Sequence, residues 1–406
     1  MKNEVFFAPL LRGALIEKTG GPWIAAYEAG SAGPALDPAA ELSLALEPGD
    51  EKAAAEKLAA ALSAAPFAGK IPLRVKISGG GKEYRYLSAP DYPGIDRIRS
   101  GEQTGPWVAG SPGVSSGGAS SGPAADYGAS RAGVVKNRVA LVTGGAQGFG
   151  EEIVRGLVLA GAFVYIADLN REGAEKLAAA LNGEQGRSVA LPVGVNVADE
   201  ESVRNMAETI ALSTGGLDLC VSNAGVLRAA SILEQDIEAF KFVTDINYTA
   251  FAIVTKHCGL LMKAQHAAAP SWPADIIQIN SKSGLDGSSK NGSYAGSKFG
   301  GIGLVQSFAK ELVEYRVKVN AVCPGNFFDG PLWSDPVKGL FVQYLKTGKA
   351  PGAKTVADVK AFYESKVPMG RGCTGPDVIR AVLYLVEQVY ETGQALPVTG
   401  GQVMLS

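Results

Sequence analysis

The sequence is poor in the residues that most often bind metals or cross-link a chain. Its 406 residues include only two histidines, His257 and His266, and four cysteines, none of which form a C-x-x-C pair. Zinc sites and disulfide frameworks need such residues at close, regular spacing. We therefore expect reduced, buried thiols and no metal site.

Long apolar runs and an excess of one charge are also missing. No apolar stretch approaches the roughly 18 residues typical of a membrane-spanning helix, and no apolar core follows a basic N-terminal start. Lys and Arg total 38 and Asp and Glu total 40, so the formal net charge is −2. This balance gives no electrostatic reason to expect nucleic acid or an anionic membrane as a partner. We expect a soluble, cytoplasmic protein.

A low-complexity stretch divides the chain. Residues 110–135 are rich in Gly, Ser, Ala and Pro, and nothing in them could bury a core. Such composition is typical of a flexible linker. It would separate a small α+β domain at residues 1–109 from a larger domain at residues 136–406.

The first part has weak but readable patterns. They predict strands at Val5–Leu11 and Ile71–Ile77, a hairpin that continues into Tyr84–Leu87, and an alanine-rich helix at Asp50–Ala65. No group of residues there suggests catalysis. We expect this part to serve assembly or regulation.

The second part alternates apolar strands with amphipathic helices. The predicted strands are Val139–Val142, Val164–Ala167, Val189–Val193, Leu217–Val221, Ile276–Ile279 and Val317–Val322. This order predicts an α/β fold with a doubly wound parallel sheet of the Rossmann type. Sheets of this kind bind ligands outside the carboxyl ends of their strands.

A glycine-rich turn follows the first of these strands. In TGGAQGFG, Gly144, Gly148 and Gly150 lie between a strand and a helix. Glycines there let backbone N–H groups and a helix N-terminus approach a pyrophosphate closely. A tight strand-to-helix connection without a ligand is the alternative.

Asp168 ends the second strand, 18 residues after Gly150. A carboxylate at that place can accept hydrogen bonds from the ribose hydroxyls of a dinucleotide, and it would repel a 2′-phosphate. NAD is therefore favoured over NADP, although Arg171 is close enough in the sequence to leave the choice open. The alternative role for Asp168 is to cap the following helix.

The stretch SKSGLDGSSKNGSYAGSKFG, residues 281–300, holds three residues that could act together. Lys298 is four residues after Tyr294 and so on the same helix face, and Ser281 is 13 positions upstream at a strand end. Tyr has an ordinary pKa of about 10, and a neighbouring cation favours its ionised form. The Ser281 hydroxyl can stabilise charge on a substrate oxygen. Ser283 and Ser293 compete for that role.

These motifs together resemble one enzyme family. They are, in chain order, TGGAQGFG, Asp168, SNAG at Ser222–Gly225, Asn247 and Tyr294-x-x-x-Lys298. The chain resembles the short-chain dehydrogenase/reductase family over nearly all of residues 137–406. Four further stretches, IIQINSKSG, KFGGIGL, KVPMGRGC and VTGGQVML, resemble members that interconvert a sugar-alcohol phosphate and a ketose phosphate.

The resemblance implies an NAD(P)-dependent oxidoreductase that prefers NAD. It implies Tyr294 as the general acid and base, with Asn247, Ser281 and Lys298 completing the catalytic set. Family members are usually homotetramers, so a tetramer or dimer is expected. The cofactor contacts that it implies are Gly144, Gln147, Gly148, Phe149, Gly150, Asp168, Asn196, Val197, Asn223, Ala224, Gly225, Tyr294, Lys298, Pro324 and Gly325.

The chain departs from the family pattern in places. Ser222 replaces an asparagine, Asn196 replaces an aspartate near the adenine, and the usual threonine after Pro324–Gly325 is missing. An aromatic-rich insertion at about residues 326–369 would act as a lid, or would serve packing or dimer contacts.

The substrate site is harder to derive from sequence. Lys282, beside the catalytic serine, is the first candidate for binding a phosphate, with Lys290 and Lys338 as weaker ones. Asn326 and Phe327 are further candidate substrate residues. Two other functions stay open: the same chemistry on an unphosphorylated polyol or a 3-oxoacyl substrate, and a regulatory protein that senses the cofactor.

Overall fold

A computed structural model describes residues 2–29, 36, 40–64, 70–72, 74–100, 102–103, 107–108, 133–337, 339–346, 348 and 350–404. The predicted linker, apart from residues 133–135, lies outside the described residues, and so does Lys338. None of the described helices has the length and apolarity needed to cross a bilayer. All four cysteines are free and buried, as expected.

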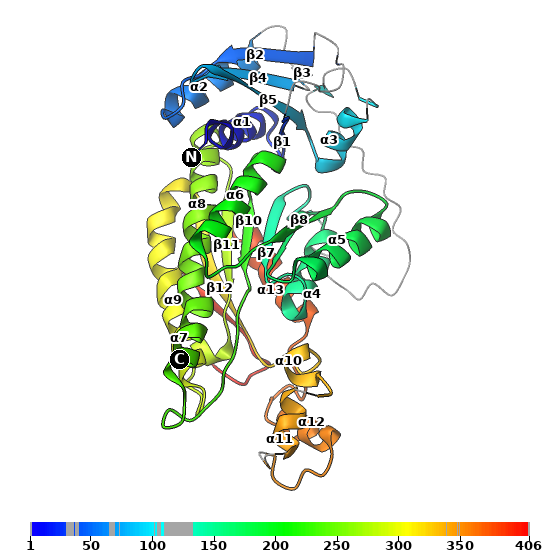
Figure 1. The fold of residues 1–406 in the computed structure, drawn as a ribbon, viewed down its shortest axis with the longest axis vertical. Coiled ribbons are helices and arrows are strands. Elements are labelled where there is room, and N and C mark those ends of the chain that lie inside the picture. The colour runs from blue at the N-terminus through cyan, green and yellow to red at the C-terminus, as the bar shows by residue number, and fades with distance from the viewer. Residues whose placement is uncertain are drawn as a thin grey trace.

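A seven-stranded parallel sheet forms the centre of the molecule (Figure 1), with the strand order β13-β12-β11-β10-β7-β8-β9. Nearly every residue of β7, β8, β10, β11 and β12 is buried, which explains their continuous apolar sequences. The predicted α/β class with a doubly wound sheet is confirmed. The strands are β7 Val139–Thr143, β8 Phe163–Asp168, β9 Ala190–Gly194, β10 Leu219–Ser222, β11 Ala274–Ile279, β12 Val317–Pro324 and β13 Ala395–Val398.

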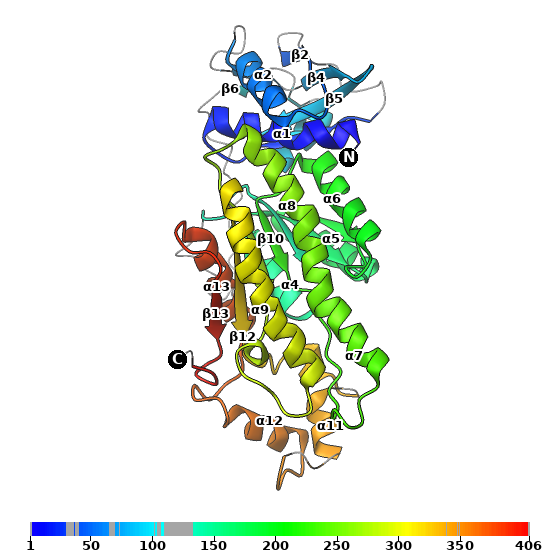
Figure 2. The ribbon, with the colours of Figure 1, turned by 90° about the vertical axis from the view of Figure 1, so that its left-hand side faces the viewer.

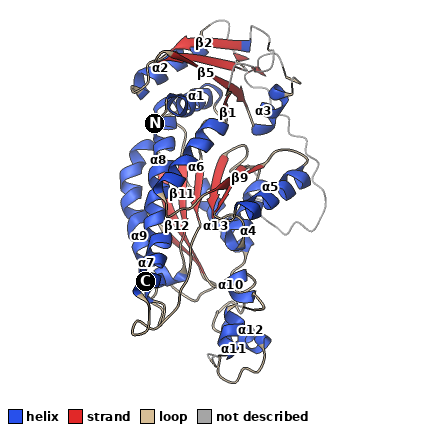
Figure 3. Cartoon of the chain, viewed as in Figure 1, coloured by secondary structure: helices blue, strands red, loops and turns tan. Residues whose placement is uncertain are grey.

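Helices cover both faces of this sheet, as the helix and strand colours of Figure 3 show. Two separate apolar clusters lie between the sheet and its two helix layers. One layer contains α4 Gly148–Leu159, α5 Arg171–Gln185 and α13 Gly375–Glu387; the other contains α6 Glu200–Thr214, α8 Ala250–Ala268 and α9 Gly292–Leu312. In Figure 2, α8 and α9 run side by side along the molecule.

A π-helical turn, Asp245–Thr249, joins α7 Ile237–Thr244 to α8. Two short 3-10 turns, Lys282–Gly284 and Val313–Tyr315, flank α9. Turns of the π type insert a residue into a helix and are frequent at functional sites.

The N-terminal residues form a second, smaller sheet with the order β1-β5-β4-β2. The predicted hairpin is present as β4 and β5, which pair in antiparallel fashion, and the predicted alanine-rich helix is α2. The strands are β1 Ile24–Tyr27, β2 Glu41–Ala45, β4 Arg74–Gly79 and β5 Lys82–Ala89, with β3 Lys70–Ile71 and β6 Trp107–Val108 as a separate pair. The helices are α1 Asn3–Thr19, α2 Glu51–Ser63 and α3 Tyr92–Arg99.

The strand predicted at Val5–Leu11 is wrong, because these residues lie within α1. This helix packs between the small sheet and α8, and Phe7, Leu10 and Leu11 are fully buried. A helix that is buried on most sides gives a nearly continuous apolar run, which periodicity cannot separate from a buried strand.

The N-terminal elements cover the amino ends of the large sheet (Figures 1 and 2). One apolar cluster joins Val5, Ile24 and Ile95 to Val139 and Leu217 of the large sheet region. The two parts of the chain thus share a core.

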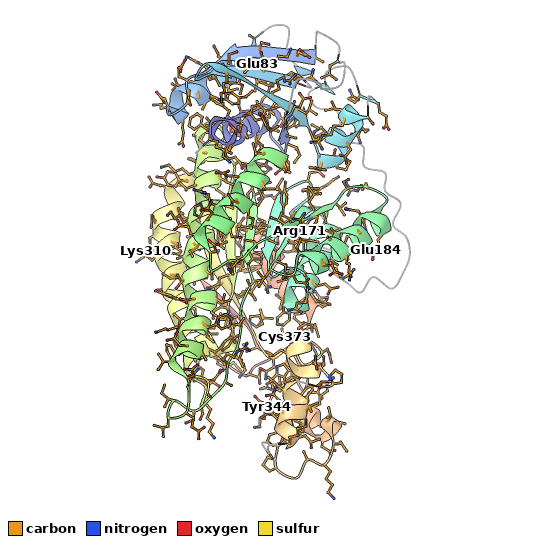
Figure 4. All side chains as sticks on the ribbon, in the orientation of Figure 1. Glu83, Arg171, Glu184, Lys310, Tyr344 and Cys373 are labelled. Atoms are coloured by element: carbon orange, nitrogen blue, oxygen red, sulfur yellow. The ribbon has the colours of Figure 1, made fainter. Side chains whose placement is uncertain are left out.

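The insertion forms a small helical body at the opposite end of the molecule (Figure 1). Its helices are α10 Pro331–Ser334, α11 Leu340–Lys346 and α12 Val356–Glu364. Its aromatic side chains pack on one another, with ring centroids of Trp333 4.9 Å from Phe328 and 5.1 Å from Phe341. The ring centroid of Tyr344, a residue labelled in Figure 4, lies 5.8 Å from that of Trp333.

Candidate active site

The glycine-rich turn links the carboxyl end of β7 to α4. Gly144 and Gly148 have φ angles of 61° and 59°, in the left-handed region that favours glycine. A Cβ atom at Gly150 would collide with the Gly144 carbonyl oxygen. The N-cap residue of α4, Gln147, makes no side-chain capping hydrogen bond. The first N–H groups of α4 can therefore bind an anionic group such as a pyrophosphate.

Asp168, at the end of β8, is held next to this turn. Its two carboxylate oxygens accept hydrogen bonds from the backbone N–H groups of Ala146 (3.0 Å) and Asn170 (2.8 Å). Arg171, labelled in Figure 4, is exposed and pairs with Glu175 at 2.8 Å. The fixed charge nearest the turn is thus negative, which suits ribose hydroxyls better than a phosphate.

Asn223 connects the carboxyl ends of β10 and β7. Its side-chain amide donates to the carbonyl oxygens of Thr143 and Gly144, each at 3.0 Å. Its backbone N–H and that of Ala224 both donate to the Thr143 hydroxyl. Asn223 thus frames the turn. Gly225 lies instead beside Asn247 and Lys298, because a Cβ atom there would be 3.2 Å from the Asn247 side-chain oxygen and 3.7 Å from the Lys298 Nζ.

Asn196 and Val197 follow β9. Asn196 is exposed, and its side-chain oxygen accepts a hydrogen bond from the Ala198 N–H at 3.1 Å. Val197 is buried. Both lie beyond the carboxyl end of their strand, at the edge that carries Asp168.

Ser281 and Tyr294 come from different elements and meet at the carboxyl end of β11. Burial raises the pKa of Tyr294, and a hydrogen bond between the Tyr294 and Ser281 side chains opposes this rise. Lys298, whose charge we expected to favour the phenolate, is not among the groups that shift this pKa. At neutral pH the phenol is therefore protonated and can donate a proton.

Lys298 is buried one turn further along α9. Its Nζ donates to the Ile279 carbonyl oxygen at 2.9 Å and lies 5.7 Å from the centroid of the Tyr294 ring. Burial lowers the pKa of Lys298 to about 8. The ammonium is therefore held at a fixed point behind the tyrosine.

Asn247 lies in the π-helical turn and is buried. Its amide accepts from the Val226 N–H at 2.8 Å, and donates to the Val226 carbonyl at 2.9 Å and to the Ser297 hydroxyl at 3.2 Å. A cavity of about 10 Å³ lies between Asn247 and Lys298 and is also lined by Ser222 and Gln278. This volume is about the minimum that one water molecule needs, and its lining is polar.

The two competing serines are both buried and differ in their contacts. Ser293 is buried and accepts a hydrogen bond from the Gln235 amide at 2.8 Å. Ser283 is also buried, and its backbone N–H donates to the Ser281 hydroxyl oxygen. Of the three serines, Ser281 is the one whose side chain is hydrogen-bonded to Tyr294.

Pro324 ends β12, and the Gly325 N–H donates to the Val398 carbonyl at 2.9 Å. The Asn326 carbonyl accepts from the Cys373 N–H at 2.8 Å, which closes the base of the insertion. Phe327 stacks on Phe149 of the glycine-rich turn, with ring centroids 4.4 Å apart and planes 12° apart. This contact between the turn and the insertion was not predicted, because no local pattern indicates it.

Lys282 follows Ser281 in the 3-10 turn and is half-buried. Burial lowers its pKa, an effect that Asp286 opposes. Among the described residues, no hydrogen bond or ion pair holds its ammonium group.

Other features of the described residues do not add to this site. No group of three or more His, Cys, Asp or Glu in the described part of the chain could hold a metal ion. A larger cavity of about 510 Å³, between the start of α13 and residues 397–404, includes none of the predicted site residues.

Comparisons with known proteins agree with this geometry. A family model described as short chain dehydrogenase matches residues 138–332. Sorbitol-6-phosphate 2-dehydrogenase of Escherichia coli is 35% identical over 271 residues, which are 66% of this chain and 99% of that protein. A 3-oxoacyl-acyl-carrier-protein reductase of Thermotoga maritima is 28% identical over 66% of this chain and 99% of that protein.

Solved structures are similar over the same share of the chain. The crystal structure of sorbitol-6-phosphate 2-dehydrogenase from Erwinia amylovora is 36% identical with a TM-score of 0.60, covering 66% of this chain and all of that one. The Pseudomonas aeruginosa RhlG/NADP active-site complex is 26% identical with a TM-score of 0.56, covering 66% of this chain and 97% of that one.

Proposed function

The chain belongs to the short-chain dehydrogenase family, and we propose that it interconverts sorbitol 6-phosphate and fructose 6-phosphate with NAD as cofactor. The observation that carries the proposal is the hydrogen-bonded pair of Ser281 and Tyr294 beside the buried Lys298. This set lies at the same sheet edge as the glycine-rich turn. A binding protein would not need a proton donor at that place.

The residues of the chain have separate tasks in this reaction. Tyr294 donates a proton to the ketone oxygen during reduction and takes it back during oxidation. The Ser281 hydroxyl donates a hydrogen bond to the same oxygen and stabilises the charge that develops there. Lys298 stabilises the phenolate once the proton has left, and Asn247 holds the polar cavity behind Lys298.

The residues present fit a nicotinamide dinucleotide. The first N–H groups of α4, which Gln147 does not cap with its side chain, would hold its pyrophosphate, and Asp168 would hold its ribose. Gly150 lets the turn pack closely against the Gly144 carbonyl. When bound, this cofactor supplies or accepts the hydride. Asp168 supports NAD over NADP, and a comparison of turnover with NADH and NADPH tests that preference.

The phosphorylated substrate is supported by two similar proteins whose names state that substrate, and by Lys282 beside Ser281. The test is an assay of NAD reduction across sorbitol 6-phosphate, other polyol phosphates and unphosphorylated sorbitol, with a 3-oxoacyl thioester tested in the reverse direction. We expect the highest kcat/KM with a polyol phosphate. No turnover of any phosphorylated substrate would refute the substrate assignment but leave the family intact.

A further inference from the structure

Asn280, the residue before Ser281, makes an unusual set of buried hydrogen bonds. Its side-chain oxygen accepts from the Ser281 N–H at 2.8 Å. Its side-chain nitrogen donates to the Lys298 carbonyl at 2.9 Å and to the Gln278 side-chain oxygen at 2.8 Å. Only 4% of Asn280 is exposed, so these bonds are made out of water. One amide therefore touches both the catalytic serine and the catalytic lysine residue.

The surrounding chain leaves room for this amide. A Cβ atom at Gly284 would overlap the Asn280 side-chain oxygen. A Cβ atom at Gly301 would lie 2.7 Å from the Gln278 amide nitrogen and 3.1 Å from that of Asn280. Gly284 and Gly301 are thus needed for the close approach of Asn280 and Gln278.

The covalent path between Ser281 and Tyr294 cannot fix their spacing by itself. It runs through residues 286–290, all of which are exposed. The hydrogen bonds of Asn280 bypass this loop and join the end of β11 directly to the second turn of α9. The Lys298 ammonium is held in addition by the neighbouring Ile279 carbonyl.

We infer that Asn280 is a positioning residue, which holds Ser281 and Lys298 in the register that proton transfer at Tyr294 requires. This inference rests on the proposed oxidoreductase function. Displacing a catalytic group by about 1 Å can lower a rate by about 100-fold. Loss of the Asn280 amide also leaves the buried Lys298 carbonyl without this donor, so the turn that carries Lys298 should shift.

The test compares Asn280→Ala with Asn320→Ala. Asn320 is a matched control, because it is fully buried on the next strand and its amide makes two hydrogen bonds, to the Glu391 carbonyl (3.0 Å) and from the Gln394 N–H (2.9 Å). We expect Asn280→Ala to lower kcat about 10- to 100-fold, with KM and the NADH dissociation constant changed less than about threefold. The pH midpoint of alcohol oxidation should move upward, because Lys298 stabilises the phenolate less well. Asn320→Ala should change neither kcat nor this midpoint.

A structural role alone would make the two variants alike. Equal losses of Tm with an unchanged kcat and pH midpoint in Asn280→Ala would overturn the inference. Gly301→Ala is a second variant, for use where Asn280→Ala does not fold, because its methyl group would displace the Gln278 and Asn280 amides. We expect the same changes in kcat and in the pH midpoint. Wild-type kinetics in Gly301→Ala would also overturn it.

Hydrogen–deuterium exchange separates this inference from the proposed function. Exchange over residues 281–285 and 294–299 should rise in Asn280→Ala or Gly301→Ala but not in Asn320→Ala. A wild-type protein that oxidises no alcohol of the panel would refute the function, and the exchange pattern would still decide the role of Asn280. Unchanged exchange over residues 281–285 and 294–299 would overturn the positioning role of Asn280.

Discussion

Arg12 and Asp218 form a fully buried ion pair although they are 206 residues apart in the sequence, with Nη2–Oδ2 and Nη1–Oδ1 distances of 2.6 and 3.0 Å. Burial by itself would raise the pKa of Asp218, but the charge and hydrogen bonds of Arg12 hold it at about 2. Asp218 also accepts from the Val139 N–H and the Trp272 indole. The N-terminal helix thus supplies a counter-charge at the amino end of β10.

Arg12→Met should destabilise the protein strongly. It leaves a buried carboxylate without its cation, and breaking a buried pair in this way costs about 3–5 kcal/mol. Urea unfolding measures the change in the free energy of unfolding. Lys2→Met is the control, because the Lys2–Glu208 pair (2.9 Å) joins the same two parts of the chain and Lys2 is largely exposed; its loss should cost at most about 1 kcal/mol.

The single variants Arg12→Met and Asp218→Asn and the double variant together form a double-mutant cycle. Removing both charges should recover part of the stability lost with Arg12 alone. A double variant less stable than the sum of the two single variants would contradict the view that an uncompensated charge causes the loss.

Asp275 should make stability depend on pH in the opposite way to an ordinary paired carboxylate. Burial raises its pKa to about 6, although the Lys318 ammonium lies 2.9 Å away. The folded state therefore binds its proton more tightly than the unfolded state, whose pKa is about 3.9. The stability due to this proton is fully present below about pH 4 and is lost as pH rises through about 6, by roughly 3 kcal/mol. Asp275→Asn should remove this dependence in unfolding measured from pH 4 to 7.

Asp377 serves as the control, because folding lowers its pKa whereas folding raises that of Asp275. Hydrogen bonds from Arg371 and Thr374, together with the charge of Arg371, outweigh its burial and lower its pKa to about 2. Its stabilisation is present above about pH 3.9 and is lost as pH falls through about 2, so this control needs unfolding measured from about pH 2 to 4 as well. If Asp377→Asn and Asp275→Asn changed the pH dependence in the same direction, the assignment for Asp275 would be wrong.

Tyr294→Phe should abolish turnover while the cofactor still binds. Phenylalanine keeps the ring and removes the proton donor, and the loss of such a group lowers rates by about 10²–10⁴-fold. Steady-state kinetics and NADH fluorescence titration measure the two effects. Turnover within about threefold of wild type would refute the role of Tyr294 as the proton donor. A wild-type protein without turnover, whose NADH binding Tyr294→Phe leaves unchanged, would favour a protein that only senses the cofactor.

The proximity of the proposed catalytic residues could be predicted from the sequence because its signals are local. Tyr294 and Lys298 share a helix face by their spacing of four, and Ser281 and Asp168 follow apolar strands whose carboxyl ends meet at one edge. Short-range periodicity and strand order predict that these residues meet, whereas their catalytic roles follow from the family resemblance and stay predictions.

The features that sequence analysis missed depend on contacts between distant segments. In the sequence, Asn280 is an ordinary polar residue at a strand end. Only the folded chain brings the Lys298 carbonyl within hydrogen-bond distance of its side chain. The Phe149–Phe327 stack and the Arg12–Asp218 pair join residues with no common pattern. The error at Val5–Leu11 has the same origin, because partners from the small sheet and α8 decide that an apolar run is a helix.

Lys282→Ala tests whether Lys282 binds the phosphate group of the substrate. A half-buried ammonium whose pKa is lowered by burial, and which no ion pair in the described part of the chain stabilises, gains most from an anionic ligand. We expect KM for sorbitol 6-phosphate to rise about tenfold with kcat changed less than about threefold, and KM for unphosphorylated sorbitol to stay unchanged. Lys290→Ala, which removes an exposed cation from the loop between Ser281 and Tyr294, is the control and should raise KM for sorbitol 6-phosphate less than Lys282→Ala does. An equal rise in KM for both substrates would assign Lys282 to the polyol chain and remove it from the phosphate site.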